Sequence, residues 1–308
     1  MSQKRIIFMG TPEISCFYLR SLHEANFNIV SVYSQPPRKR GRGMILEESP
    51  VHKFATKNNI EVSTPKDLNS EETKEHIKKI KPDLIIVMGY GLKLPKFILE
   101  LAIYGCFNVH VSLLPRWRGA APIEYALMNN DKYTGITIFK LVSEMDAGPI
   151  IAKRSIPINQ NINKENLIKE LNIEGAKLLK VTIPNIFKDN INFEDQDLAK
   201  VTYAHKITAD LRKIDFDQDV ETINNKIRAF SPSPGAWFIY NNERIKLIKS
   251  KYTKGNWTHS TIINNQFHIG CKYGKICPEI IQREGKKPMS LENFLRGFDF
   301  NIGSKVNV

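Results

Sequence analysis

An amide, an imidazole and a carboxylate in this sequence have the chemistry that acyl transfer requires. Asn108 and His110 are two residues apart within the run Ile103–Val111, which is rich in β-branched and aromatic residues. On an extended strand, this spacing places both side chains on the same face. Asp146 follows in the separate segment SEMDAGP. We expect this carboxylate to orient the imidazole, as in hydrolytic triads, and the amide to stabilise developing negative charge.

A proline indicates where this strand ends. Ser112-Leu113-Leu114-Pro115 follows the run directly, and proline cannot continue a central strand because it lacks the N–H donor. The polar side chains should therefore lie at the carboxyl end of a strand, where open α/β sheets bind their ligands. A single histidine or asparagine at such a place is more often structural. The combination of the three groups is what favours a catalytic site.

Composition limits the class of protein. The chain has 308 residues, of which 42% are hydrophobic, so we expect a globular protein of two domains. Its apolar runs are too short to span a membrane, and the first one breaks at Gly10-Thr11-Pro12, too early for a signal peptide. We therefore expect a cytoplasmic protein without membrane contact. Its four cysteines lack paired C-x-x-C spacing, which predicts neither a metal site nor a disulfide framework.

Short apolar runs alternate with amphipathic stretches through the first part of the chain. We predict strands at Arg5–Met9, Ile29–Tyr33 and Leu84–Met88, and helices at Glu71–Ile80 and Asn163–Phe187. This alternation is typical of a doubly wound, mostly parallel α/β sheet of the Rossmann-like type. We therefore expect an α/β domain over residues 1–188.

The rest of the chain has a different pattern. Residues 189–205 are mostly polar without periodicity and predict a linker. Further on, a helix is expected around residues 220–230, followed by several short strands separated by Asn, Gly and Lys turns. Residues 206–308 should therefore form a small β-domain, shaped as a barrel. The predicted strands are Ala236–Tyr240, Arg244–Ser250, Thr261–Ile263 and Gln266–Gly270.

A basic segment lies between the second predicted strand and the next helix. The formal charge of the chain is +13, but the sequence is lysine-rich throughout, so total charge says little about a partner. The segment Pro36–Gly43 is instead rich in arginine, which suits phosphate contact and stacking on bases. Its glycines give it backbone freedom, so we expect it to be mobile until a nucleic acid orders it.

Several motifs together resemble one known family. Asn-x-His-x-Ser-Leu-Leu-Pro at 108–115 and Arg-Trp-Arg-Gly-Ala-Ala-Pro-Ile at 116–123 are similar to the signature of the methionyl-tRNA formyltransferases. Gly41-Arg42-Gly43 and the stretch Ser231–Trp237 resemble other elements of that family, and Asp146 falls where its catalytic aspartate would. The resemblance extends over nearly the whole chain.

The resemblance implies an activity and a set of site residues. It implies transfer of the formyl group of 10-formyltetrahydrofolate to the α-amino group of initiator methionyl-tRNA, without a metal. We expect a monomer. The implied catalytic residues are Asn108, His110 and Asp146. The implied folate-binding residues are Val87, Gly89, Tyr90, Gly91, Ser112, Leu113, Leu114 and Pro115. The resemblance implies tRNA binding by Gly41, Arg42 and Gly43 and an OB-like tRNA-binding domain at 206–308. The basic composition of the segment extends the predicted tRNA-binding residues to Arg38, Lys39 and Arg40.

Three alternatives remain open on the sequence. One is a formyltransferase for a small amine, which would not require the basic segment or a second domain. Another is a formyltetrahydrofolate hydrolase, which shares the three side chains but should carry an added N-terminal regulatory module. The third is a non-catalytic RNA-binding protein, which would leave the spacing of Asn108, His110 and Asp146 unexplained.

Overall fold

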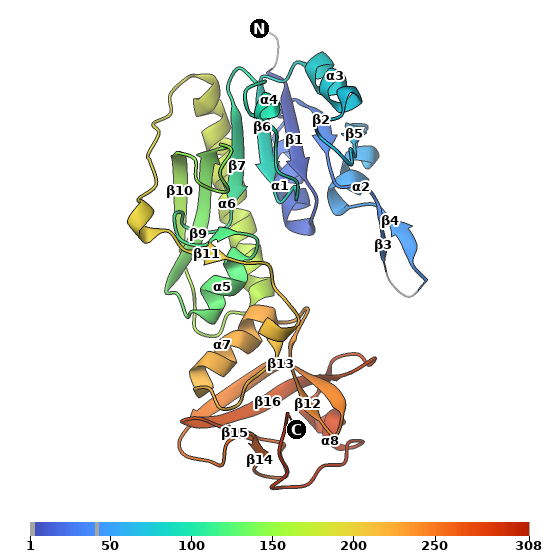
Figure 1. Ribbon diagram of the computed structural model, residues 1–308, viewed down its shortest axis with the longest axis vertical. Helices are drawn as coiled ribbons and strands as arrows, with labels where there is room; N and C mark the ends of the chain where they lie inside the picture. Colours follow the sequence, from blue (N-terminus) through green and yellow to red (C-terminus); the bar gives the residue numbers. More distant parts are fainter. Residues whose placement is uncertain (1–3, 41–42, 308) are drawn as a thin grey trace. The chain divides into compact units, whose positions relative to one another are not determined.

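The computed structural model describes residues 4–40 and 43–307, and these pack into two compact units. The first unit comprises Met1–Arg118, Gly135–Ile156 and Glu170–Tyr203. The second comprises Gly119–Thr134, Pro157–Lys169 and Ala204–Val308. Figure 1 shows the elements of both units in sequence colours. Two segments from the middle of the chain thus belong to the second unit.

The first unit is built on a seven-stranded sheet with the order β10-β9-β7-β6-β1-β2-β5. The pairs β1–β2, β1–β6, β2–β5 and β6–β7 are parallel, whereas β7–β9 is antiparallel. The predicted doubly wound, mostly parallel fold is therefore confirmed. The strands are β1 (Ile6–Gly10), β2 (Ile29–Tyr33), β5 (Glu61–Ser63), β6 (Leu84–Met88), β7 (Cys106–His110), β9 (Tyr133–Lys140) and β10 (Ile150–Pro157).

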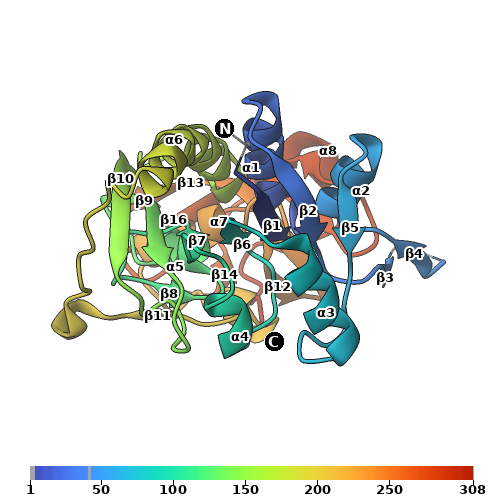
Figure 2. The ribbon, with the colours of Figure 1, turned by 90° about the horizontal axis from the view of Figure 1, so that it is seen from above.

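Helices cover both faces of this sheet. Figure 2 shows α1, α2 and α6 on one face and α3 and α4 on the other. Because both faces are covered, β1 and β6 are buried along their whole length, as their unbroken apolar sequences require. The helices are α1 (Glu13–Glu24), α2 (Pro50–Lys57), α3 (Glu71–Ile80), α4 (Lys96–Leu99) and α6 (Lys164–Phe187).

Local sequence explains where two of these helices begin. Ser49 caps α2 by accepting a hydrogen bond from the His52 N–H, and Pro50 occupies the first turn, where its missing N–H has no cost. Ser70 caps α3 in the same way, and two glutamates follow it in the first turn. The boundaries of α3 and of the strands β2 and β6 are those predicted.

The second unit contains an antiparallel sheet with the order β12-β13-β16-β15-β14, and β17 pairs with β16. Phe267 lies at the centre of its core and makes ring contacts with Phe238, Tyr240 and Phe294. The predicted small β-domain is therefore confirmed. Its strands are β12 (Ala236–Tyr240), β13 (Glu243–Lys254), β14 (Thr261–Ile262), β15 (Ile269–Cys271), β16 (Gly274–Arg283) and β17 (Met289–Ser290). Its helices include α5 (Pro122–Met128), α7 (Val220–Phe230) and α8 (Leu291–Leu295).

The segment predicted to be linker contains short elements. The 3-10 helix η1 spans Leu198–Lys200, and β11 (Tyr203–Ala204) pairs with β8 (Arg118–Gly119). Another 3-10 helix, η2, spans Asp210–Arg212. No helix in the described ranges is both long and apolar enough to cross a lipid bilayer.

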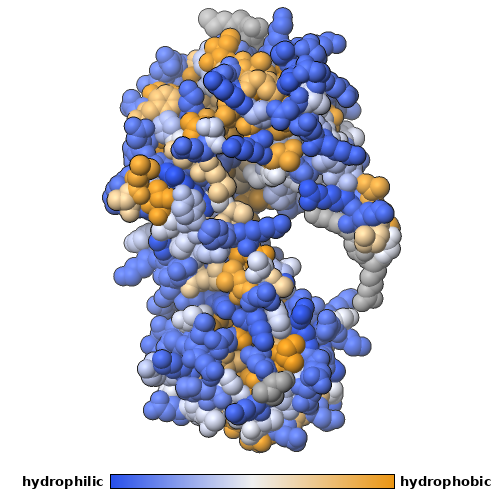
Figure 3. Space-filling model, in the orientation of Figure 1, coloured by the Kyte–Doolittle hydropathy of each residue, from blue (hydrophilic) through white to orange (hydrophobic). Residues whose placement is uncertain are grey.

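The basic segment differs from the mobile loop expected of it. β3 (Arg38–Arg40) and β4 (Ile45–Glu47) pair as an antiparallel hairpin, while Gly41 and Arg42 lie outside the described residues. The expectation of a loop over 38–40 was wrong, because the apolar run Met44–Leu46 supplies two residues of the strand β4 that pairs with these residues. That run is 62–75% exposed and forms hydrophobic surface on the hairpin (Figure 3).

Gly175 in α6 provides a test of how α1 and α6 pack. A Cβ atom there would lie 1.9 Å from the Tyr18 hydroxyl oxygen, which donates a hydrogen bond to the Leu171 carbonyl. An exposed helical glycine usually gains about 1 kcal/mol of stability when replaced by alanine, but this overlap should reverse the sign. Gly175→Ala should therefore lower the free energy of unfolding by about 1–3 kcal/mol.

Thermal unfolding measures this effect. Gly297→Ala is the control, because a Cβ there meets no atom within 4 Å. A variant at Gly175 that is as stable as the parent would contradict the close packing of α1 against α6.

Candidate active site

Strand β7 positions Asn108 and His110 beside the centre of the parallel sheet. Asn108 pairs with Val87 of β6 on one side and with Phe139 of β9 on the other, and His110 pairs with Thr137. Asn108 is half-buried, and His110 is only 6% exposed. Both predicted residues are therefore on one strand at its carboxyl end, with alternate side chains pointing to the same face.

The two ring nitrogens of His110 have different partners. Nε2 lies 2.9 Å from the Trp117 carbonyl oxygen, and Nδ1 lies 3.8 Å from Asp146 Oδ2. A carbonyl oxygen only accepts, so Nε2 must carry the proton of the neutral ring and Nδ1 must be its basic atom. A proton that arrives on Nδ1 would face the Asp146 carboxylate. The pair can therefore take up one proton and hold it as an ion pair.

Two residues of this site have left-handed backbone conformations. Trp117 has φ +63° and Asp146 has φ +50°, although neither is a glycine. Such conformations cost on the order of 1–3 kcal/mol and persist only where surrounding contacts hold them. Thr202 supplies two of these contacts, because its hydroxyl accepts from the Trp117 N–H and its carbonyl from the Arg118 N–H, each at 2.9 Å. Arg116 adds its guanidinium 4.2 Å from the centre of the Trp117 ring.

Hydrogen bonds to β9 fix the Ser112–Pro115 loop. The Thr137 hydroxyl donates to the Ser112 carbonyl at 2.7 Å and accepts from the Leu114 N–H at 3.1 Å. The Ser112 hydroxyl donates to the Arg116 carbonyl at 2.6 Å. Thr137 is also the cross-strand partner of His110. This predicted folate-binding loop is therefore held next to the imidazole.

The other predicted folate-binding loop follows β6. Gly89 and Gly91 have φ +56° and +88°, which explains why glycine occupies both positions. The Thr11 hydroxyl donates to the Tyr90 carbonyl at 3.0 Å and so ties this loop to the turn after β1. Val87 and Tyr90 are buried in the apolar core, and burial raises the pKa of the Tyr90 hydroxyl. These two residues can therefore meet a ligand only through their backbone.

Gln35 was not identified from the sequence. It follows β2, its backbone N–H donates to the Thr11 hydroxyl at 3.3 Å, and a Cβ at Gly91 would lie 3.9 Å from its Cγ. Its Oε1 accepts from Arg38 Nη2 at 2.9 Å. Its Nε2 is buried without a hydrogen-bond partner among the described residues, so it is a donor that a ligand can satisfy.

Gln196, within the predicted linker, was also missed. It is 7% exposed, its Oε1 accepts from the Arg118 guanidinium, and its Nε2 donates to the carbonyls of Asp146 and Gly148. No local signal marks it, because its partners lie 48–78 residues away in the sequence. A segment that has no periodicity can still be part of a site.

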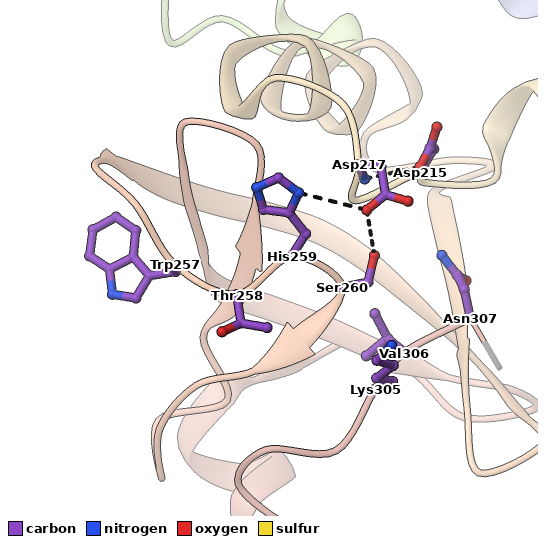
Figure 4. Close-up of a pocket in the computed structure, with 9 residues that line it drawn as sticks. All are labelled: Asp215, Asp217, Trp257, Thr258, His259, Ser260, Lys305, Val306 and Asn307. Carbon is purple, nitrogen blue, oxygen red and sulfur yellow. Dashed lines mark hydrogen bonds and ion pairs between the residues drawn. The ribbon is translucent and has the colours of Figure 1, made fainter.

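A separate pocket lies in the second unit. Figure 4 shows Asp217 beside Ser260, which donates to its Oδ1 at 3.2 Å, and beside His259, at 3.9 Å. The pocket has a volume of about 660 Å³ and is also lined by Trp257 and Lys305. Across residues 4–40 and 43–307, neither this pocket nor any other place gathers three His, Cys, Asp or Glu side chains that could hold a metal ion.

An acid–base pair and an amide at the carboxyl end of a strand in an open α/β sheet fit a group-transfer enzyme or a hydrolase. Comparison with known proteins decides between these two classes of enzyme and identifies the chemical group on which the enzyme acts. The formyl transferase model matches residues 4–183, and the formyl transferase C-terminal domain model matches residues 206–299. The chain therefore belongs to the formyl transferase family.

Individual relatives are similar over their full length. A methionyl-tRNA formyltransferase of Pelagibacter ubique is 39% identical, with 98% of each chain covered. One from Ehrlichia canis is 40% identical, with 96% of this chain and 97% of the relative covered. Among solved structures, the sugar 3N-formyl transferase WlaRD has a TM-score of 0.66 at 22% identity, covering 93% of this chain and all of that one. This last similarity concerns the fold alone.

Cys106 is the thiol nearest to the site in sequence, and it can be tested as a nucleophile. It is fully buried in β7, and burial raises the pKa of its thiol, so it should be inert in the folded protein. A thiol reagent should label the half-buried Cys277 and leave Cys106 unmodified until the protein unfolds. Cys106→Ala should keep the parent turnover number. Loss of turnover on modification of Cys106 in the native state would contradict this.

Proposed function

We propose that this protein transfers the formyl group of 10-formyltetrahydrofolate to the α-amino group of initiator methionyl-tRNA. The observation that carries the proposal is the full-length similarity to relatives that bear the name methionyl-tRNA formyltransferase. The imidazole–carboxylate pair of His110 and Asp146 supplies the acid–base chemistry that this reaction requires.

The proton transfers can be assigned to atoms. A neutral α-amino group attacks the formyl carbon, and because such groups titrate near pH 8 this nucleophile needs little activation. Asn108 donates an amide N–H to the formyl oxygen as negative charge develops there. Nδ1 of His110 takes the amine proton, which then faces Asp146 Oδ2. The same proton passes to the departing folate nitrogen when the carbon–nitrogen bond breaks.

The formyl donor would be held mainly by backbone groups. The loops 87–91 and 112–115 follow neighbouring strands, and their glycine and proline residues give the backbone close access to a planar ring. Gln35 Nε2 is a buried donor beside Gly91 and would contribute one side-chain hydrogen bond.

The tRNA would meet two parts of the chain. We assign the acceptor stem to the segment 38–43, of which Arg38 and Lys39 are described as part of the β3–β4 hairpin. Residues 206–308 would form the tRNA-binding domain and residues 1–188 the catalytic domain, in keeping with the two family models. A cytoplasmic monomer is the simplest form of this proposal, and light scattering that finds a dimer would contradict it.

An assay with three amines tests the function. The purified protein is incubated with 10-formyltetrahydrofolate and either charged initiator tRNA, free methionine or a small amino sugar nucleotide. Formylation of the charged tRNA alone is the expected result. Preference for a small amine would replace the proposal by a small-molecule formyltransferase, and hydrolysis without transfer would indicate a hydrolase.

The catalytic side chains should affect turnover rather than binding. His110→Ala and Asp146→Ala should lower kcat strongly and leave the Kd for tRNA nearly unchanged, because their interactions develop in the transition state. Asn108→Ala should lower kcat by about 100–1,000-fold, the usual loss for one oxyanion donor. Asn108→Asp keeps the shape of the side chain and is the matched control. Its kcat should be at least as low as that of Asn108→Ala, because a carboxylate cannot donate a hydrogen bond to the formyl oxygen. Substantial turnover by His110→Ala would refute the acid–base assignment.

The role of the basic segment in tRNA binding can be tested at Arg42. Arg42→Leu should reduce formylation of charged tRNA by at least about tenfold, since a charge-assisted contact contributes about 1.5–3 kcal/mol. Folate binding should be unchanged, because the folate loops are separate segments. Lys39→Ala should have a smaller effect and mainly flatten the salt dependence of kcat/KM. Parent-like formylation by Arg42→Leu would make the segment a plain solvated surface.

A further inference from the structure

Gln196 uses all of its hydrogen-bonding capacity inside the catalytic unit. Oε1 accepts from Arg118 Nε at 3.0 Å and from Nη2 at 2.8 Å. Nε2 donates to the carbonyl of Asp146 and to that of Gly148, both at 2.8 Å. An amide offers two lone pairs and two N–H groups, so none remains unsatisfied. We propose that Gln196 is a positioning residue that fixes the Asp146 carboxylate relative to His110 Nδ1.

The bonds of Nε2 determine the conformation of the Asp146 loop. They hold the chain at two carbonyls, one on each side of Ala147, directly after the left-handed Asp146. A loop held at only one point can rotate about it, whereas two points fix both position and direction. The backbone of Asp146 is therefore fixed, and this places its Oδ2 atom 3.8 Å from His110 Nδ1.

The bonds of Oε1 connect the same amide to the other half of the pair. Arg118 is 5% exposed and directly follows Trp117, whose carbonyl accepts the hydrogen bond from His110 Nε2. The positions of both His110 and Asp146 thus depend on the side chain of Gln196. Gln196 acts on them through the main chain, so removing it should change the rate of proton transfer more than the binding of either substrate.

The proposal rests on the proposed function and is tested with two variants. Gln196→Met keeps the length of the side chain and removes all four hydrogen bonds. Gln196→Glu keeps acceptance from Arg118, but it turns an oxygen toward the two carbonyls. Both should lower kcat on the order of 100-fold, the loss expected for a displacement of about 1 Å, with KM values nearly unchanged. Because Glu retains the Arg118 contact, it keeps the test informative if the Met variant does not fold.

A double-mutant cycle separates positioning from general stability. In an Asp146→Ala background, Gln196→Met should lower kcat by at most about tenfold, far less than in the parent, because the carboxylate that it fixes is absent and only its contact to Arg118 is lost. Equal losses in both backgrounds would overturn the proposal. Asn185→Leu is the matched control, because it removes an amide-to-carbonyl hydrogen bond of 2.9 Å within α6 and should keep the parent kcat.

Hydrogen exchange distinguishes failure of this inference from failure of the proposed function. The amides of residues 143–148 should exchange faster in Gln196→Met than in the parent, whatever the substrate is. If the parent does not formylate tRNA but this difference is observed, the proposed function fails and the positioning role survives. If exchange in this loop is unchanged, Gln196 does not hold it and the inference is refuted.

Discussion

The hydrogen bond from His110 Nε2 to the Trp117 carbonyl determines the chemistry of the whole site. It uses the nitrogen that hydrolytic triads leave free for substrate, so the basic atom is Nδ1, which faces Asp146. Asp146 is therefore not needed to fix the tautomer of the imidazole, as the aspartate of a hydrolytic triad does. It can instead stabilise the charge that the imidazole acquires.

This bond exists only because a bulky residue has a left-handed backbone. Trp117 aims its carbonyl at the imidazole with φ +63°, a conformation that Thr202 and the stacked Arg116 help to hold. The parallel sheet fixes the other side of the bond, since His110 is buried in β7 and paired with β9. The rigid strand supplies precision, and the strained loop supplies an orientation that a regular element cannot provide.

Sequence patterns predicted what depends on local periodicity. The strands β2 and β6 and the helices α3 and α7 have the predicted boundaries, because unbroken apolar runs and regularly spaced apolar residues mark them. β7 is shorter than the run Ile103–Val111 because exposed Ile103 lies outside the sheet, and β16 was not predicted because Pro278 and charged residues interrupt its pattern. Asn108, His110 and Asp146 were predicted from residue type and resemblance. Gln196 and Thr202 were not, since their partners are distant in sequence, and no motif marks Gln35.

The choice of an amide rather than a carboxylate at residue 196 follows from the charges around it. Arg118 is a buried cation, and a glutamate would pair with it more strongly than Gln196 does. A glutamate would, however, turn a carboxylate oxygen toward the carbonyls of Asp146 and Gly148, which accept hydrogen bonds and cannot donate one. The neutral amide satisfies Arg118 and the two carbonyls without this penalty. One neutral side chain therefore holds the Arg118 guanidinium and the main chain of the Asp146 loop at the same time.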